Sequence, residues 1–156
     1  YAVTIVALIT ATWLWSGGHR PELIVLLRGA VLLLVAPPVF KEVFDRPRPV
    51  GGLAEVGGDA YPSGHATQGV IYSWIALTIA LRLRAGMPRA SALVIGGLAL
   101  TAAIGLSRVE LGVHYLSDVS GGWALGVSIF ALLAILAILV SYFRQNDPPM
   151  EGTDGV

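Results

Sequence analysis

Residues 107–118 read SRVELGVHYLSD and separate two long apolar runs. If this stretch is helical, His114 and Asp118, four residues apart, share a face on which their side chains can touch. A carboxylate on one imidazole nitrogen fixes the tautomer and leaves the other nitrogen as a nucleophile or base. Arg108 adds a planar cation that suits a phosphate. Ionisable residues next to segments that are apolar enough to cross a membrane are energetically costly and are usually kept for a function. We therefore interpret this stretch as an active site.

The composition of the chain is typical of a membrane protein. Of its 156 residues, 55% are hydrophobic and only 13% are charged, and the mean hydropathy is +0.74. Apolar runs long enough to cross a bilayer support the same class. The formal net charge is zero, so nothing indicates nucleic-acid binding, and the absence of cysteine excludes disulfides and thiolate metal sites.

Five apolar runs predict an all-α fold, a polytopic transmembrane helical bundle. The runs cover residues 1–15, 23–40, 66–81, 90–106 and 119–143, and the last helix is expected to begin near Gly112. Adjacent prolines at 37 and 38 are expected to kink the second helix. We expect one transmembrane domain over residues 1–143, followed by a polar, disordered tail over residues 144–156.

Successive connections between five spans lie on alternate sides of a membrane. One side would hold the ionisable residues near the predicted site, which are Lys41, Arg46, Arg48, His65, Arg108, His114 and Asp118. The other would hold a second basic set, which is His19, Arg20, Arg82, Arg84, Arg89 and Arg144. If the first set is kept for chemistry, the positive-inside rule makes the second side cytoplasmic, and the site faces the periplasm or the cell exterior.

Two further polar segments are expected on the side of residues 107–118. Residues 41–49, KEVFDRPRP, combine a lysine at a helix end with arginines held by stiff prolines, which lowers the entropy lost when Arg48 binds an anion. Residues 62–65, PSGH, place a serine and a flexible glycine before a helix, whose N-terminal amides favour a phosphate. His65 then stands at the rim of the site. Residues 50–61 are long enough for a small lid.

The three segments together resemble the signature of the type 2 phosphatidic acid phosphatase superfamily. The matching patterns are Lys-x6-Arg-Pro from Lys41, Pro-Ser-Gly-His from Pro62 and Ser-Arg-x5-His-x3-Asp from Ser107, in the family's order and spacing. The family includes integral-membrane lipid phosphatases and soluble vanadium haloperoxidases, and the apolar composition argues for the first group. Its membrane members usually have six helices, so we expect a further span before residue 1.

The resemblance implies a role for each matching residue. His114 would attack phosphorus to form a phosphohistidine, Asp118 would orient it, and His65 would protonate the departing lipid oxygen and then activate water. The phosphate-binding residues would be Lys41, Arg48, Ser63, Gly64 and Arg108. No metal or other cofactor is expected, because three cations with helix-end amides can stabilise the charge in phosphoryl transfer.

We therefore predict a phosphatase domain at residues 1–143, integral to the bilayer of a bacterial inner membrane. Its partner would be a membrane lipid substrate: phosphatidate, phosphatidylglycerol phosphate or a prenyl diphosphate. The alternatives are a non-enzymatic carrier or sensor of lipid phosphates, a zinc site at His65, His114 and Asp118, and a His–Asp pair that only stabilises a helix.

The sequence also predicts the surroundings of two charged residues and of three glycines. Arg46 lies outside the signature positions and is expected to face lipid headgroups rather than the phosphate. Glu110 either neutralises Arg108 or faces water. The glycines at 121, 122 and 126 predict close contacts between helices.

Overall fold

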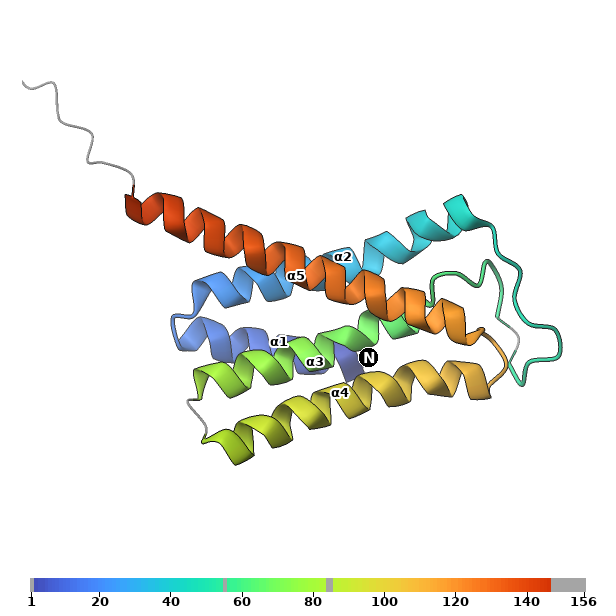
Figure 1. The fold of residues 1–156 in the computed structure, drawn as a ribbon, viewed down its shortest axis with the longest axis horizontal. Helices are drawn as coiled ribbons and strands as arrows, with labels where there is room; N and C mark the ends of the chain where they lie inside the picture. The colour runs from blue at the N-terminus through green and yellow to red at the C-terminus, as the bar shows by residue number, and fades with distance from the viewer. Residues whose placement is uncertain (1, 55, 84–85, 147–156) are drawn as a thin grey trace, which may run out of the picture.

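The computed structural model describes residues 2–54, 56–83 and 86–146, and within these ranges it contains five helices and no strand (Figure 1). The helices are α1 (Ala2–Ser16), α2 (Arg20–Phe44), α3 (Gly64–Arg82), α4 (Met87–Glu110) and α5 (Leu116–Asn146). The predicted all-α fold is confirmed. Helix α5 continues three residues into the predicted tail, and residues 147–156 of that tail lie outside the described residues.

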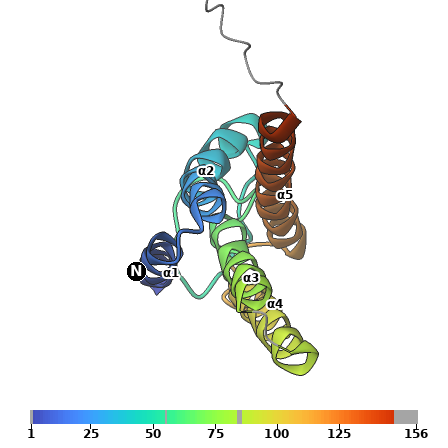
Figure 2. The same cartoon turned by 90° about the vertical axis from the view of Figure 1, so that its left-hand side faces the viewer.

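Three of the helices are long and apolar enough to cross a membrane. Their most apolar 18-residue windows have mean hydropathies of 2.4 for α2, 1.9 for α4 and 2.7 for α5. Helix α1 is apolar but has only 15 residues. Helix α3 contacts all four other helices and lies in the middle of the bundle (Figures 1 and 2). It is not one of these three helices, and its buried Thr67 and Thr78 face protein rather than lipid.

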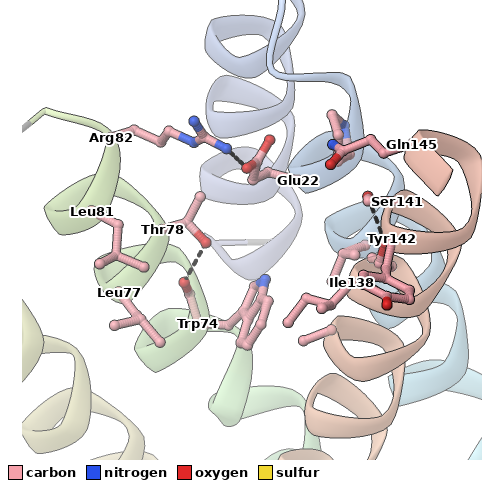
Figure 3. Close-up of a pocket in the computed structure, with 14 residues that line it drawn as sticks. Glu22, Trp74, Leu77, Thr78, Leu81, Arg82, Ile138, Ser141, Tyr142 and Gln145 are labelled. Carbon is pink, nitrogen blue, oxygen red and sulfur yellow. Dashed lines mark hydrogen bonds and ion pairs between the residues drawn. The ribbon is translucent and has the colours of Figure 1, made fainter.

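The connections of the bundle gather at two opposite ends (Figure 1). At one end, residues 45–63 between α2 and α3 meet residues 111–115 between α4 and α5, where Leu53 N–H donates to the Leu111 carbonyl at 2.9 Å. At the other end, Glu22 of α2 pairs with Arg82 of α3 (Figure 3). The polar motif segments thus share one end and the second basic set shares the other, as predicted, although Arg84 lies outside the described residues.

Helix α2 continues through both internal prolines. It ends at Phe44, four residues beyond the predicted end of the second apolar run, and Pro37 is buried inside the bundle. Asp45 then ends the helix in a left-handed conformation, and its amide donates to the Lys41 carbonyl at 3.0 Å. As a result, Lys41 lies on the last turn of α2.

The predicted start of the last helix near Gly112 is wrong. Gly112 has a positive φ of 65° and lies against Gly52, at which an added Cβ would be 2.6 Å from the Gly112 carbonyl oxygen. This left-handed residue and close backbone contact prevent helix formation there. Helix α5 begins only at Leu116, so His114 lies in the connecting turn and does not share a helical face with Asp118.

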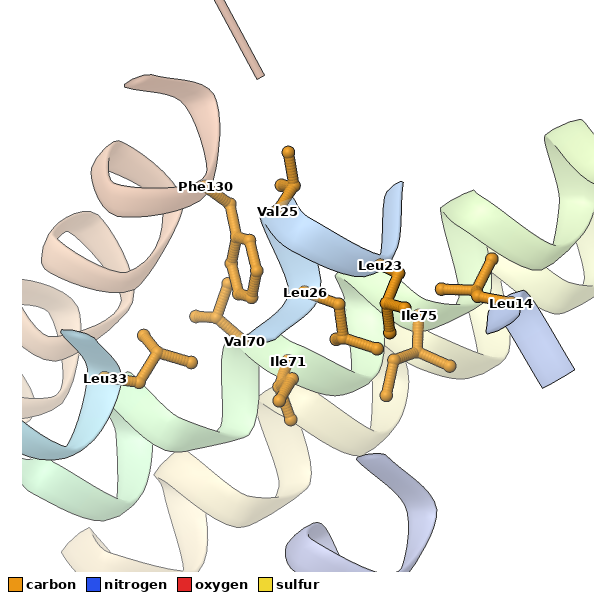
Figure 4. Packing of buried hydrophobic residues seen from close by; sticks show 9 residues of the cluster. All are labelled: Leu14, Leu23, Val25, Leu26, Leu33, Val70, Ile71, Ile75 and Phe130. Carbon is orange, nitrogen blue, oxygen red and sulfur yellow. The ribbon is translucent and has the colours of Figure 1, made fainter. Parts of the chain in front are cut away.

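The apolar core lies where α1, α2, α3 and α5 meet (Figure 4). Phe130 of α5 reaches between α2 and α3 and stacks on Trp74, with ring centroids 4.8 Å apart. Many large apolar side chains on the outer faces of α4 and α5 remain exposed, as expected of helices that face lipid. The core cluster comprises Leu14, Leu23, Val25, Leu26, Leu33, Val70, Ile71, Ile75 and Phe130.

Helices α3 and α5 approach closely because α5 carries glycine at their contact. A Cβ added to Gly122 would lie 2.6 Å from the carbonyl oxygen of Ser63, and one added to Gly126 would lie 2.8 Å from that of Thr67. Such small residues let membrane helices come into backbone contact. The predicted helix contacts are therefore found for Gly122 and Gly126, and they fix the start of α3 against the first turns of α5. Gly121 instead lies against the Tyr61 ring, which belongs to the connection between α2 and α3.

We expect Gly122→Ala to lower the thermal unfolding temperature in detergent, because the new methyl group must push the two backbones apart. Overpacking of this kind typically costs about 1–3 kcal/mol. The matched control is Gly96→Ala on α4, where an added Cβ meets nothing within 4 Å. That change should leave stability unchanged or raise it by up to about 1 kcal/mol through helix propensity. Equal unfolding temperatures for the two variants would contradict the packing described.

Candidate active site

Asp118 is the most constrained side chain at the motif end of the bundle. It is completely buried, and its Oδ2 accepts a hydrogen bond from the Tyr115 amide at 2.8 Å. Because Tyr115 precedes the first residue of α5, this contact is the reciprocal half of a capping box, in which the third residue of a helix reaches back to the cap. The main-chain carbonyl of Asp118 also accepts from the Ser63 amide at 2.9 Å, so Asp118 joins the starts of α3 and α5.

His114 lies between this carboxylate and a cation. Its side chain is only 4% exposed, and its Nδ1 is 3.6 Å from Asp118 Oδ2, longer than a hydrogen bond but within ion-pair range. Its Nε2 is 3.3 Å from Arg48 Nη1. Because a guanidinium only donates, this contact requires Nε2 to carry a lone pair, which leaves the proton on Nδ1, facing Asp118.

The surroundings of His114 favour its neutral form. Burial lowers the pKa of His114 from its ordinary value near 6.5, and the positive charge of Arg48 lowers it further. Asp118 raises the pKa in opposition, and the more distant Lys41 lowers it again. The net pKa is lowered, so near neutral pH His114 holds an unprotonated nitrogen directed at a cation.

Arg48 is held by main-chain carbonyl groups. Its Nε donates to Gly58 O at 2.8 Å, its Nη1 to Val113 O at 2.8 Å, and its Nη2 to Gly57 O at 3.3 Å. These contacts come from both segments at this end of the bundle, the 45–63 connection and the 111–115 turn. The guanidinium is therefore fixed before any anion arrives, which reduces the entropy cost of binding.

The other predicted phosphate-binding residues stand at helix ends around the same place. Lys41 Nζ donates to the Asp59 carbonyl at 2.7 Å, and Arg108 lies on the last turn of α4 beside the Ser107 hydroxyl. Ser63 caps α3, and Gly64 is its first residue.

His65 is the second residue of α3 and is exposed. Lys41, Arg48 and Arg108 all lie near enough to its ring to act on it electrostatically. The structure therefore brings all eight predicted site residues to one end of the bundle, while their individual roles stay predictions.

Arg46 is a site residue that the sequence interpretation missed, and its expected headgroup-facing position is wrong. Its Nη1 donates to Asp118 Oδ1 at 2.8 Å and to the Ser117 hydroxyl at 2.7 Å, and its guanidinium lies 4.7 Å above the centre of the Tyr115 ring. The available signal was the need of a buried carboxylate for a counter-charge, with an unassigned arginine in a motif segment.

The contacts also decide how Glu110 is placed and whether the two histidines meet at a metal site. Glu110 is exposed at the end of α4, and Arg108 hydrogen-bonds to Ser107 instead. His65, His114 and Asp118 do not gather into a group that could hold a metal ion, and no such group occurs in residues 2–54, 56–83 and 86–146. The absence of a required metal nevertheless stays a prediction.

A cavity of about 610 Å³ opens beside Arg48. Five of its nine lining residues belong to the predicted lid, and the others come from Arg48, Pro49 and the turn before α5. The cavity thus reaches the guanidinium from the side away from the helices. Its lining residues are Arg48, Pro49, Gly51, Gly52, Ala54, Val56, Gly57, Gly112 and Val113.

Comparison with known proteins identifies the family. The sequence model of the PAP2 superfamily matches residues 22–146. This chain belongs to the PAP2 superfamily. The match covers α2 to α5 and the three motif segments, so the resemblance inferred from those segments is confirmed.

Two PAP2 relatives are informative. Phosphatidylglycerophosphatase B of Bacillus subtilis (strain 168) is 32% identical over 111 residues, which are 69% of this chain and 54% of that protein. The chain thus spans about half the length of this relative. The crystal structure of a transmembrane PAP2 type phosphatidylglycerolphosphate phosphatase from Bacillus subtilis superposes with a TM-score of 0.79 at 25% identity, covering 90% of this chain and 71% of that one. With the three spanning helices, this likeness identifies an integral membrane protein.

We expect Arg48→Gln to raise the pKa of His114, because the change removes a neighbouring cation that disfavours the imidazolium. Arg48→Lys, which keeps the charge, should leave the pKa low. NMR titration of histidine-labelled protein in micelles measures both, with the His114 signal assigned by its loss in His114→Gln. Identical titration in wild type and Arg48→Gln would contradict the electrostatic account.

Proposed function

We propose that this PAP2 protein is a lipid phosphatase that works through a phosphohistidine intermediate and needs no metal. The single observation that carries the proposal is the position of the His114 imidazole, which is buried between a carboxylate and a fixed guanidinium. A structural histidine does not need a lone pair directed at a cation cluster. A nucleophile that attacks a bound phosphate does.

The proposed reaction has two displacements. His114 Nε2 attacks phosphorus, the bond from phosphorus to the lipid oxygen breaks, and His65 gives that oxygen its proton. Water then attacks the phosphohistidine, His65 takes a proton from the water, and the nitrogen–phosphorus bond breaks to release phosphate. Together the two steps restore the starting state of the two histidines.

The surrounding residues stabilise charge in both steps. Arg48, Lys41 and Arg108 would hold the phosphoryl oxygens together with the Ser63 hydroxyl and the Gly64 amide at the start of α3. Asp118 would stabilise the positive charge that develops on the His114 ring, and its own position is held by Arg46 and the Tyr115 amide. No step requires a metal ion, because phosphoryl transfer depends mainly on positioning and charge.

The location of the site supports a lipid substrate. The cluster stands at the helix ends of a bundle whose outer faces are apolar, so a phosphate at the bilayer surface can reach it while the lipid tails stay in the membrane. The names of the relatives favour phosphatidylglycerol phosphate, with phosphatidate and prenyl diphosphates as the other candidates. The basic residues at the opposite end favour a periplasm-facing site in a bacterial inner membrane.

We expect His114→Ala to abolish phosphate release from short-chain phosphatidylglycerol phosphate while the protein stays folded. The control is His19→Ala, which changes a histidine at the opposite end of the bundle and should leave turnover unchanged. Alkaline quenching with a labelled substrate should reveal an acid-labile phosphoprotein in wild type and none in His114→Ala.

Three outcomes of this assay would count against the proposal. Wild-type turnover in His114→Ala would exclude the nucleophile. Substrate binding with no turnover in wild type would favour a carrier or sensor. Strong inhibition by EDTA would favour a zinc site, whereas inhibition by vanadate, which imitates five-coordinate phosphorus, is expected.

We expect Arg46→Gln to reduce kcat by about 10- to 100-fold with little change in KM, by analogy with partners that orient metal-bound histidines. Without Arg46 the negative charge of Asp118 acts on His114 uncompensated and raises its pKa, so the acidic limb of the pH–rate profile should move to higher pH. Arg46→Lys should restore part of the rate and the original limb. A rate loss with no movement of the limb would assign Arg46 a purely structural role.

A further inference from the structure

Three consecutive main-chain carbonyl groups near the end of the predicted lid hold two of the proposed phosphate-binding cations. Arg48 donates from Nη2 to Gly57 O at 3.3 Å and from Nε to Gly58 O at 2.8 Å. Lys41 donates from Nζ to Asp59 O at 2.7 Å. Because Lys41 lies on α2 and Arg48 in the connection after it, residues 57–59 fix cations of two different elements relative to each other.

The conformation of Gly58 decides how these oxygens are directed. The peptide groups that carry Gly57 O and Gly58 O flank the Gly58 Cα, so the dihedral angles of Gly58 set whether both oxygens face the Arg48 guanidinium. Its φ is 73°, in the left-handed region, where most L side chains cost about 1–2 kcal/mol. An added Cβ would meet nothing within 4 Å. The position therefore favours glycine because of its backbone angle and not for lack of space.

The segment that carries these carbonyl groups is itself held by a main-chain contact. The Ala60 amide donates to Arg46 O at 2.7 Å, and Ala60 is completely buried. The positions of the carbonyl groups therefore do not depend on the cations alone. Since a lysine offers three donors and an arginine five, both cations retain N–H groups for an anion while their bonds to the carbonyl oxygens stay intact.

The carbonyl groups also offset the repulsion between the two cations. Lys41 and Arg48 are near enough to act on each other electrostatically. Their hydrogen bonds to the carbonyl oxygens are charge-assisted and balance part of this repulsion. The contacts that align the two cations therefore also make it less costly to keep them together.

We propose that Gly58 is a positioning residue, whose left-handed conformation directs three carbonyl groups so that Lys41 and Arg48 are prealigned to bind one phosphoryl group. This inference rests on the proposed function only for the identity of the anion. Gly58 acts through the two cations and adds no charge of its own. Loss of its conformation should leave the charge of the site unchanged and remove the alignment of the cations, so the affinity for phosphate should fall.

The test measures the binding of inorganic phosphate to the full chain in micelles, from the shift of the His65 and His114 NMR signals. Gly58→Val is expected to raise the Kd for phosphate about ten-fold or more through lost preorganisation, because a β-branched residue is strongly disfavoured at a positive φ. Gly58→Asn, which tolerates the left-handed conformation, should keep the Kd within about two-fold of wild type.

Gly51→Val is the matched control. Gly51 lies in the same connection, also has a left-handed φ, of 82°, and leaves equally open space for a Cβ. The hydrogen bonds that Lys41 and Arg48 donate to carbonyl groups of the described residues end elsewhere. The two valine variants should therefore unfold at similar temperatures, while Gly51→Val binds phosphate like wild type.

An unchanged Kd in Gly58→Val, an equal loss in Gly51→Val or in Gly58→Asn, or an absence of phosphate binding in the wild type would each overturn the positioning role. Phosphate release is not part of this measurement. If the wild type and the variants bind phosphate in the expected pattern and the wild type hydrolyses no lipid phosphate, the positioning role is supported and the phosphatase is contradicted.

Discussion

The buried carboxylate of Asp118 is the constraint on which the active end of this protein depends. A fully buried charge is tolerated only when it is paired and hydrogen-bonded, and here the partners come from two separate segments. Arg46 approaches from the 45–63 connection, whereas the Tyr115 amide and the imidazole of His114 approach from the turn before α5. The contacts of this one carboxylate therefore hold His114, the start of α5 and the 45–63 connection in fixed positions relative to one another.

The close contact of α3 with α5 also stabilises this arrangement. Because Gly122 has no side chain, the carbonyl of Ser63 can lie against α5, and the Ser63 amide can reach the main chain of Asp118. The start of α3, whose amides favour an anion, is thus held beside the His–Asp pair. Burial of α3 among the four other helices lets it carry threonines and glycines that a lipid-facing helix would replace by larger apolar residues.

Much of this organisation was predictable from the sequence, because apolar runs fix the number of helices and alternate connections fix which motifs share an end. The exact start of α5 was not, since the left-handed turn at Gly112 depends on contact with Gly52, sixty residues earlier in the chain. Arg46 was missed for a related reason. In Arg-Pro-Arg-Pro the spacing does not tell which arginine faces the buried carboxylate, because the course of the loop decides this.

In the proposed reaction, the charges around His114 would let a single imidazole both attack phosphorus and carry the resulting positive charge. Before substrate binds, burial and the cation of Arg48 keep the pKa of the ring low, which favours an unprotonated ring nitrogen. A bound phosphate places negative charge beside the same cations and offsets their effect on the ring. As the proposed nitrogen–phosphorus bond forms, Asp118, 3.6 Å from His114 Nδ1, would then face a developing positive charge on the imidazole. In the proposed mechanism, the cations that would hold the substrate would thus also keep the nucleophile unprotonated before the substrate binds.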